Sequence, residues 1–343
     1  AWLSGKQKGK ARTQAEQHIK EGHAQLIVGT HALFQDNVGF NKLGLVIIDE
    51  QHRFGVDQRL ALRNKGNDQF TPHQLVMTAT PIPRTLAMSA YGDLDTSVID
   101  ELPPGRTPIQ TVTIPLDRRE QVLQRIATNC REGKQAYWVC TLVEQSETLD
   151  AQAAEATYQE IKDRFPDVNI GLVHGKMKAN EKQAVMQAFK DNQLQLLIAT
   201  TVIEVGVDVP NASIMVIENA ERLGLSQLHQ LRGRVGRGAT ASFCALLYKA
   251  PLSQNGQERL SILRESNDGF VIAEKDLEIR GPGELLGTKQ TGGMGFRVAR
   301  LERDDHLLSQ AHVVAQHILK DYPRQAGGLL KRWLPHAPRY AYV

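Results

Sequence analysis

Short apolar runs rich in β-branched residues recur along the chain, and longer stretches with helical patterning separate them. Three runs come early, at 25–30, 43–50 and 74–80, and six follow, at 109–114, 135–140, 169–175, 194–201, 212–218 and 242–248. Parallel strands need long, usually helical connections, so this alternation is typical of parallel sheets whose faces are covered by helices. The sequence therefore predicts an α/β fold.

The segment "ELPPGRTP" at 101–108 marks a boundary between two domains. Its prolines are incompatible with a helix and favour an extended linker. Six candidate strands follow it, enough for a complete α/β domain, whereas the block before it holds only about half of one. We therefore expect an incomplete α/β domain at 1–102, a linker at 103–108 and a complete α/β domain at 109–250.

The pattern changes from Pro251 onward. Residues 257–281 show the pattern of two helices broken near Asn267–Gly269, and a Gly-rich loop and a terminal helical stretch come after them. We expect 251–343 to form a helical hairpin, a loop and a C-terminal tail.

Charge and cysteine content narrow the classes of function. The formal net charge of +3 is nearly neutral, so any nucleic-acid surface must be a local patch. The three cysteines lie far apart without a CxxC pair or clustered histidines, which argues against disulfides and zinc and suits a reducing cytosol. No apolar run approaches the length of a membrane span.

Because the chain begins at Ala1 without an initiator Met, we expect it to be a piece of a longer protein.

Two adjacent carboxylates, Asp49 and Glu50, end the apolar run at 43–50. Ligands of open α/β sheets bind beyond the carboxyl ends of the strands. An Asp at that position can hold Mg²⁺ through water, while a neighbouring Glu polarises an attacking water. His52 extends the pair to Asp-Glu-x-His, and the next strand ends in Thr78-Ala79-Thr80, on the same expected edge. A solvated acidic turn is the competing interpretation.

The run "QLHQLRGRVGRG" at 227–238 alternates glycines with arginines. Glycine lets the backbone turn tightly, and we expect Arg232, Arg234 and Arg237 to project as planar donor forks suited to phosphate oxygens. Arginines supplied by a second domain can stabilise charge on a transferring phosphoryl group. A basic loop that binds RNA or an acidic partner is the alternative.

The run "LLIATTVIEVGVDVP" at 196–210 ends a strand in hydroxyl-bearing residues. Thr200 and its backbone amides suit a nucleic-acid phosphate, and Asp208, which follows Gly206, suits a ribose hydroxyl. Taken alone, this run favours a polar strand–helix connection.

Together these motifs resemble the motor of superfamily 2 helicases, in which two RecA-like domains clamp ATP and move along nucleic acid. The ordered set is DEQH (49–52), TAT (78–80), VHGKM (173–177), ATTVIEVGVD (199–208) and QLRGRVGR (230–237). The longer runs DEQHRFGV, ATPIPRTLAMSAYGDLDTSVIDELPPGRTP and DLEIRGPGELLGTKQTG narrow the resemblance to the RecG family of DNA helicases. The resemblance covers essentially the whole chain.

The resemblance implies roles for individual residues. At the nucleotide, Asp49 would bind Mg²⁺ through water, Glu50 would act as general base, and Gln230, Arg234 and Arg237 would face the triphosphate, with Gly206 and Asp208 also on the nucleotide side. His52, Thr78 and Thr80 would couple the nucleotide to DNA. The DNA-binding and coupling set would further comprise Thr30, His31, His174, Thr200, Arg280 and Gln290.

The implied parent protein is an ATP-driven translocase on double-stranded DNA. It would remodel stalled replication forks and four-way junctions in a bacterial cytoplasm as a monomeric motor, with single-stranded DNA-binding protein as a partner. The family's phosphate loop, G-x-x-x-x-G-K-[ST], does not occur in this sequence. The run GKQKGK (5–10) has the wrong spacing, Ala11 in place of a hydroxyl and no expected preceding strand, so a solvated basic turn is the better interpretation. We therefore expect the isolated chain not to hydrolyse ATP.

Two other interpretations remain open. The chain could be a DNA-binding module without chemistry, or part of a translocase that couples transcription to repair. A phosphate loop upstream would separate enzyme from binder. An upstream wedge domain, rather than a polymerase-binding domain, would separate the two enzymes.

Overall fold

The computed structural model describes residues 1–50, 65, 71–78, 95–101, 106–141, 147–201, 209–238, 240–280 and 304–333. The chain divides into two compact units. One comprises Ala1–Ala79 with Gln310–Val343, and the other comprises Thr80–Ser309.

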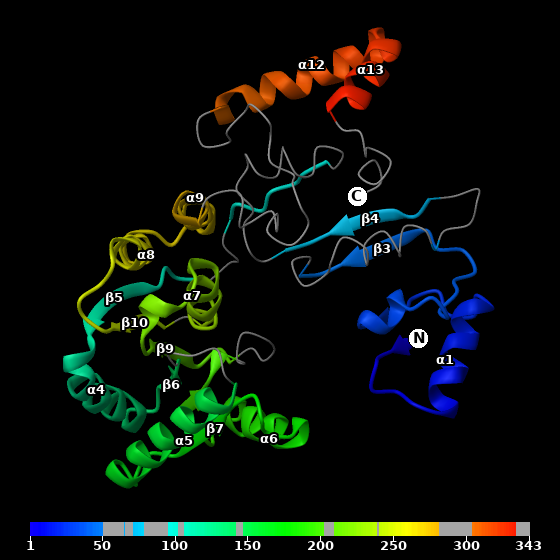
Figure 1. Cartoon of the computed structure of the whole chain (residues 1–343). Helices are drawn as coiled ribbons and strands as arrows, with labels where there is room; N and C mark the ends of the chain where they lie inside the picture. Colours follow the sequence, from blue (N-terminus) through cyan, green and yellow to red (C-terminus); the bar gives the residue numbers. More distant parts are fainter. Residues whose placement is uncertain are drawn as a thin grey trace. The chain divides into compact units, whose positions relative to one another are not determined.

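The unit at 80–309 is built on a parallel sheet with the strand order β5-β10-β9-β6-β8-β7 (Figure 1). The strands are β5 (Gln110–Pro115), β6 (Gln135–Val139), β7 (Ile170–Val173), β8 (Leu196–Ala199), β9 (Ala212–Ile217) and β10 (Phe243–Tyr248). Every residue of β6, β8 and β9 is buried, as expected for parallel strands covered on both faces. The predicted α/β class and all six strand positions are confirmed.

Helices cover both faces of this sheet. They are α4 (Arg119–Arg131), α5 (Glu147–Arg164), α6 (Ala179–Lys190), α7 (Leu225–Arg232), α8 (Gln254–Glu265) and α9 (Gly269–Arg280). Side chains alternate between the faces: Trp138 of β6 packs with α4 and α5, whereas the adjacent Tyr137 packs with the core formed by α6 to α9.

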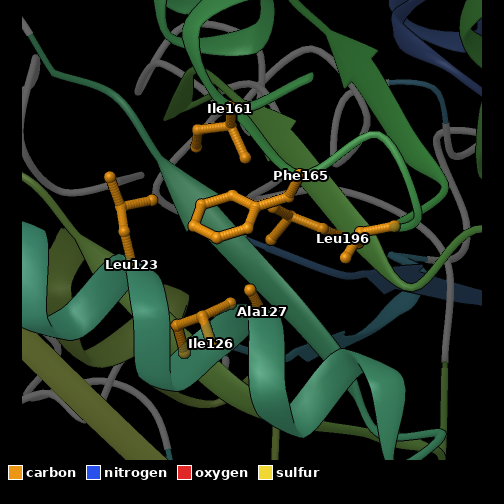
Figure 2. Close-up of a pocket in the computed structure, with 7 residues that line it drawn as sticks. Leu123, Ile126, Ala127, Ile161, Phe165 and Leu196 are labelled. Atoms are coloured by element: carbon orange, nitrogen blue, oxygen red, sulfur yellow. The ribbon is translucent and has the colours of Figure 1, made fainter. Parts of the chain in front are cut away.

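The apolar contact between α4 and α5 is part of the core. Leu123 and Ile126 of α4 face Ile161 of α5 and the following Phe165, with Leu196 of β8 beside them (Figure 2). All the side chains that line this space are apolar, so it offers no polar group to orient a ligand.

Helices α8 and α9 form the predicted hairpin, and the break lies where the sequence places it. The Ser253 hydroxyl accepts a hydrogen bond from the Gly256 amide at 3.1 Å and caps the start of α8. Between the helices, the Asp268 carboxylate accepts from the Phe270 amide at 2.8 Å. Short polar side chains therefore end one helix and begin the next.

The N-terminal unit holds two small parallel pairs. Strand β1 (Trp2–Leu3) pairs with β2 (Val28–Gly29), and β3 (Leu45–Ile48) pairs with β4 (His73–Val76). Helix α1 (Lys10–Lys20) packs through Ile19 on Leu3, next to a 3₁₀ turn at His31–Phe34. The expectation that no strand precedes residues 5–10 is wrong, because β1 lies there. A two-residue strand is too short to produce a periodic pattern. The observed β2 covers only Val28–Gly29, so the strand predicted at 25–30 is longer than the observed one.

Two helices, α12 (Leu308–Asp321) and α13 (Pro323–Trp333), occupy the C-terminal stretch that was expected to be helical. Pro323 stands at the first position of α13, where its missing N–H costs nothing. Among the described residues, no helix is both long and apolar enough to cross a membrane.

Candidate functional site

Asp49 and Glu50 follow β3 directly. The Glu50 backbone N–H donates to Asp49 Oδ1 at 2.9 Å, and Glu50 has a φ of 55°. A left-handed conformation costs a residue with a side chain roughly 1–2 kcal/mol, so the turn is strained. Strain of this kind concentrates at functional sites, and here it turns the chain sharply just after the first carboxylate.

Strand β3 is buried on one face only. Val46 and Ile48 are buried, but Leu45 and Ile47 are 56% and 57% exposed. One face of the β3–β4 pair is therefore in a core and the other is open.

Thr78 lies on the same edge as the acid pair, as the sequence indicated. Ile48 pairs with Val76 in the parallel ladder, and the Met77 N–H donates to the Ile48 carbonyl at 2.8 Å. The residues that follow the two strands therefore leave the sheet side by side. His52 and Thr80 lie outside the described residues, and the coupling role of this edge stays a prediction.

The 233–238 loop, which we call the arginine loop, begins where α7 ends. It lies at the amino-terminal edge of the large sheet, since Gly236 packs on Ile109 just before β5 and Gly238 packs on Pro210 just before β9. Gly236 has a φ of +77°, and a Cβ at Gly238 would lie 2.4 Å from the Pro210 carbonyl oxygen. At these two positions the backbone admits no side chain without rearrangement.

The loop is also held by hydrogen bonds to one carbonyl. Gly233 O accepts from Arg237 Nε at 3.2 Å and from Arg106 Nη2 at 3.1 Å. Arg237 is exposed and Arg234 and Gln230 are half-buried, so the predicted nucleotide-facing residues gather around this loop. Arg106 was not identified from the sequence as a candidate, because the two partners are far apart along the chain.

Arg232 does not project toward a ligand, so this part of the prediction is wrong. It is 3% exposed, and its guanidinium donates to the Leu263 and Ser266 carbonyls at 2.8 Å each and to Thr111 Oγ1 at 3.4 Å. Arg232 therefore ties α7 to the end of α8 and to β5. The sequence held a signal for this: Arg232 stands four residues after the buried Leu228, on the core-facing stripe of the helix.

His229, which is half-buried beside Arg232, was also missed. Arg232 Nη2 lies 3.0 Å from His229 Nδ1. Burial, together with the nearby Arg232 and Arg106 charges, lowers the pKa of His229 to about 4. Because arginine only donates, Nδ1 must accept, and the imidazole is neutral with its proton on Nε2.

His174 and Thr200 lie at the opposite edge of the same sheet. They follow the carboxyl ends of the adjacent strands β7 and β8, and the Thr200 N–H donates to the Val173 carbonyl at 3.2 Å. Both are buried, and His174 Nε2 is 3.3 Å from Glu155 Oε1. Within this unit, the predicted DNA-side residues and the arginine loop therefore occupy opposite edges of the sheet.

In the N-terminal unit, Thr30 joins the basic turn at 5–10. Thr30 Oγ1 accepts from the Gly5 N–H at 3.4 Å, and the Thr30 N–H donates to the Leu3 carbonyl at 3.1 Å. The lysines at positions 6, 8 and 10 are exposed, so a local basic surface lies beside Thr30 and His31.

The remaining candidates are not described. Gly206, Asp208 and Gln290 lie outside the described residues, and Arg280 ends α9 without a described side chain. Within the described part of the chain, no cluster of His, Cys, Asp and Glu could hold a metal by itself. The three cysteines are buried free thiols, and burial raises the pKa of Cys130 and Cys244 to about 12, which makes them unreactive.

Three family models match successive parts of the chain. They are the DEAD/DEAH box helicase model at residues 2–89, the helicase conserved C-terminal domain at 118–239, and domain 3, C-terminal, of the ATP-dependent DNA helicase RecG at 266–328.

Whole-chain comparisons agree with these models. The ATP-dependent DNA helicase RecG of Escherichia coli K12 is 66% identical over 342 residues, which is 99% of this chain and 49% of the relative. RecG of Bacillus subtilis is 50% identical over 93% of this chain and 46% of the relative. A solved structure of RecG bound to a three-way DNA junction matches with a TM-score of 0.65 and 44% identity, covering 90% of this chain and 39% of that one.

The chain spans about half the length of the curated relatives that it matches. Over that span the identity is 66% to the Escherichia coli relative and 50% to the Bacillus subtilis relative, and the helicase and RecG-specific models occur in the order that the motifs indicated. The chain therefore belongs to the RecG family of ATP-dependent DNA helicases.

Proposed function

We propose that this chain forms the greater part of the motor of a DNA helicase, which uses ATP and Mg²⁺ to move on duplex DNA and to remodel branched DNA. The observation that carries this proposal is the arginine loop. Two glycines and a shared carbonyl hold it in one conformation beside the linker, and it presents an exposed Arg237. Preorganised positive charge of this kind can stabilise a transferring phosphoryl group without reorganisation cost.

The acid pair fits a hydrated magnesium ion. Asp49 is an exposed carboxylate at the end of a parallel strand, and oxygen ligands with retained water are what Mg²⁺ prefers. Asp49 would hold the hydrated ion, which would supply charge neutralisation at the phosphates, and Glu50 would accept the proton of the attacking water. Gln230, Arg234 and Arg237 would bind the triphosphate, with Gly206 and Asp208 also on the nucleotide side. His52, Thr78 and Thr80 would couple nucleotide binding to the DNA-binding surface.

For DNA, we propose two phosphate-binding regions and one coupling region. The basic turn with Thr30 and His31 forms the first, and the β7–β8 edge with His174 and Thr200 forms the second. Lysines and backbone amides that contact phosphates fix position without reading sequence. Arg280 and Gln290 would couple the hairpin to translocation. The relative solved with a three-way junction supports branched DNA as the substrate.

The wider organisation of the protein follows from the same proposal. We assign a first RecA-like domain at 1–102, a linker at 103–108, a second RecA-like domain at 109–250 and a translocation region at 251–343. We further propose a monomeric motor in the bacterial cytoplasm, acting with single-stranded DNA-binding protein. The phosphate loop would come from residues upstream of this chain in the whole protein.

The test compares this chain with the same chain extended upstream through the phosphate loop. We expect Mg²⁺-dependent ATPase only in the extended form, stimulated by forked DNA and abolished by Glu50→Gln or Arg237→Ala. Glu101→Gln, which also removes a carboxylate but lies at an exposed position just before the linker, serves as the matched control. Absence of ATPase in both forms, with DNA binding retained, would instead support a binding module without chemistry.

A further inference from the structure

We propose that Arg106 is a positioning residue for Arg237, so that the segment entering β5 sets the geometry of the arginine loop. This inference rests on the proposed function. Arg106 Nη2 and Arg237 Nε donate to the same acceptor, Gly233 O, at 3.1 and 3.2 Å. The two guanidinium groups are therefore held in a fixed relation through one carbonyl.

That carbonyl is well placed to hold both groups. Gly233 follows the last residue of α7, and its N–H still donates to the His229 carbonyl at 2.9 Å. The carbonyl end of a helix carries partial negative charge, which favours cations there. A planar guanidinium can donate to a carbonyl and keep its remaining N–H groups in a defined plane, which an ammonium group cannot do.

The same segment touches the loop at a second point. A Cβ at Gly236 would lie 2.9 Å from the Ile109 side chain and 3.7 Å from the Thr107 carbonyl oxygen. Residues 106–109 therefore hold the loop at Gly233 and at Gly236, on either side of Arg234. A shift of this segment would move the loop directly, without deforming the sheet.

The consequence is a specific role for the linker. Because Arg106 lies in the segment that joins the two proposed RecA-like domains, the conformation of that segment determines where Arg237 points. Arg106 acts through Arg237 and need not touch the nucleotide.

The first experiment measures ATPase kinetics in the whole protein. Arg106→Ala is expected to lower kcat about tenfold with little change in the KM for ATP, because misplacing a charge-stabilising group affects mainly the transition state. Arg106→Lys, which keeps one donor, is expected to recover part of the loss. Arg118→Ala is the matched control: Arg118 is an exposed arginine of the same unit that donates to Gln121 at 2.9 Å, and its loss should leave kcat unchanged.

The second experiment asks whether Arg106 acts through Arg237. Arg237→Lys keeps a positive charge but removes the Nε donor to Gly233. In that background, Arg106→Ala should lower kcat less than about twofold, because effects that pass through one shared contact are not additive. A full repeat of the single-variant loss would overturn the proposal, as would a wild-type kcat for Arg106→Ala.

Thermal unfolding separates positioning from misfolding. The Arg106 variants should melt within a few degrees of the wild type, and loss of rate that tracks loss of folded protein would also overturn the proposal. Failure of the proposed function would give a different result from failure of the Arg106 proposal, because Arg237→Ala itself would then leave the ATPase rate unchanged.

Discussion

Arg232 donates a hydrogen bond from Nη2 to Nδ1 of His229, at 3.0 Å. Both side chains belong to α7, and the Arg232 guanidinium also donates hydrogen bonds to the carbonyls of Leu263 and Ser266 at the end of α8. The pair thus joins the helix that leads into the arginine loop to the hairpin that follows it. Through its two terminal nitrogens the planar guanidinium therefore binds acceptors on α7, at the end of α8 and on β5 at the same time.

The protonation of His229 predicts how stability depends on pH. In the unfolded chain His229 titrates near its ordinary pKa of 6.5, whereas in the folded chain burial and the Arg232 and Arg106 charges lower the pKa to about 4. The unfolded state therefore binds more protons between these values, and stability falls as pH drops through that window. From pH 7.5 to 5.0, this group should remove roughly 2 kcal/mol of unfolding free energy.

The measurement compares wild type with His229→Asn by urea unfolding at both pH values. Asparagine keeps an acceptor for Arg232 but does not titrate. The loss of unfolding free energy between the two pH values should be smaller in the variant by about that amount. An equal loss in both proteins would show that His229 is not the titrating group.

Removing Arg232 should destabilise the unit at 80–309. Arg232→Met leaves one buried and one partly buried carbonyl without this donor, and such losses typically cost ~2–4 kcal/mol. Fluorescence of the buried Trp138 would report unfolding in a background where Trp2 and Trp333 are changed to Phe. The control is Arg264→Ala, an arginine whose ion-pairing side chain is 52% exposed and whose loss should cost under about 1 kcal/mol. Equal effects of the two variants would contradict the structural role of Arg232.

The glycines of the arginine loop should differ from glycines in open positions. Gly238→Ala would force the Pro210 backbone to move, so we expect a loss of about 2 kcal/mol or more. Gly236→Ala meets Ile109 and a positive φ, and should cost ~1–2 kcal/mol. Gly44→Ala, with open space around it, should be within about 0.5 kcal/mol of wild type. A Gly238→Ala protein as stable as Gly44→Ala would disprove the close contact.

The open face of the β3–β4 pair should make the isolated chain self-associate. Leu45, Ile47 and Leu75 are each about half exposed or more, and they lie on one face of adjacent strands. Contiguous apolar surface and unpaired strand edges favour association. Ile47→Thr combined with Leu75→Thr should shift sedimentation velocity profiles toward the monomer. Leu26→Thr, at an exposed leucine off this face, should not, and an unchanged profile for the double variant would refute the idea.

Local sequence patterns were sufficient to predict many of the strands and turns of this protein. The apolar run at 43–50 placed the acid pair at a strand end, and the six runs after the linker placed every strand of the large sheet. The stretch Asn267–Gly269 located the break in the hairpin. Each of these features depends on neighbours within a few positions, which is the range that periodicity, prolines and capping residues report.

The tertiary structure determined which residues of a motif are buried in the core and which are exposed in a loop. Arg232 and Arg237 belong to one short run, yet one is buried between helices and the other is exposed in a loop, because the helix ends between them. The linker residue Arg106 meets Gly233 across 127 positions of the chain, since β5 enters the sheet next to β10, the strand that the arginine loop leads into. Sequence alone determined the parts and their chemistry. The order of the strands determined which parts touch, because that order brings together residues whose separation no local pattern records.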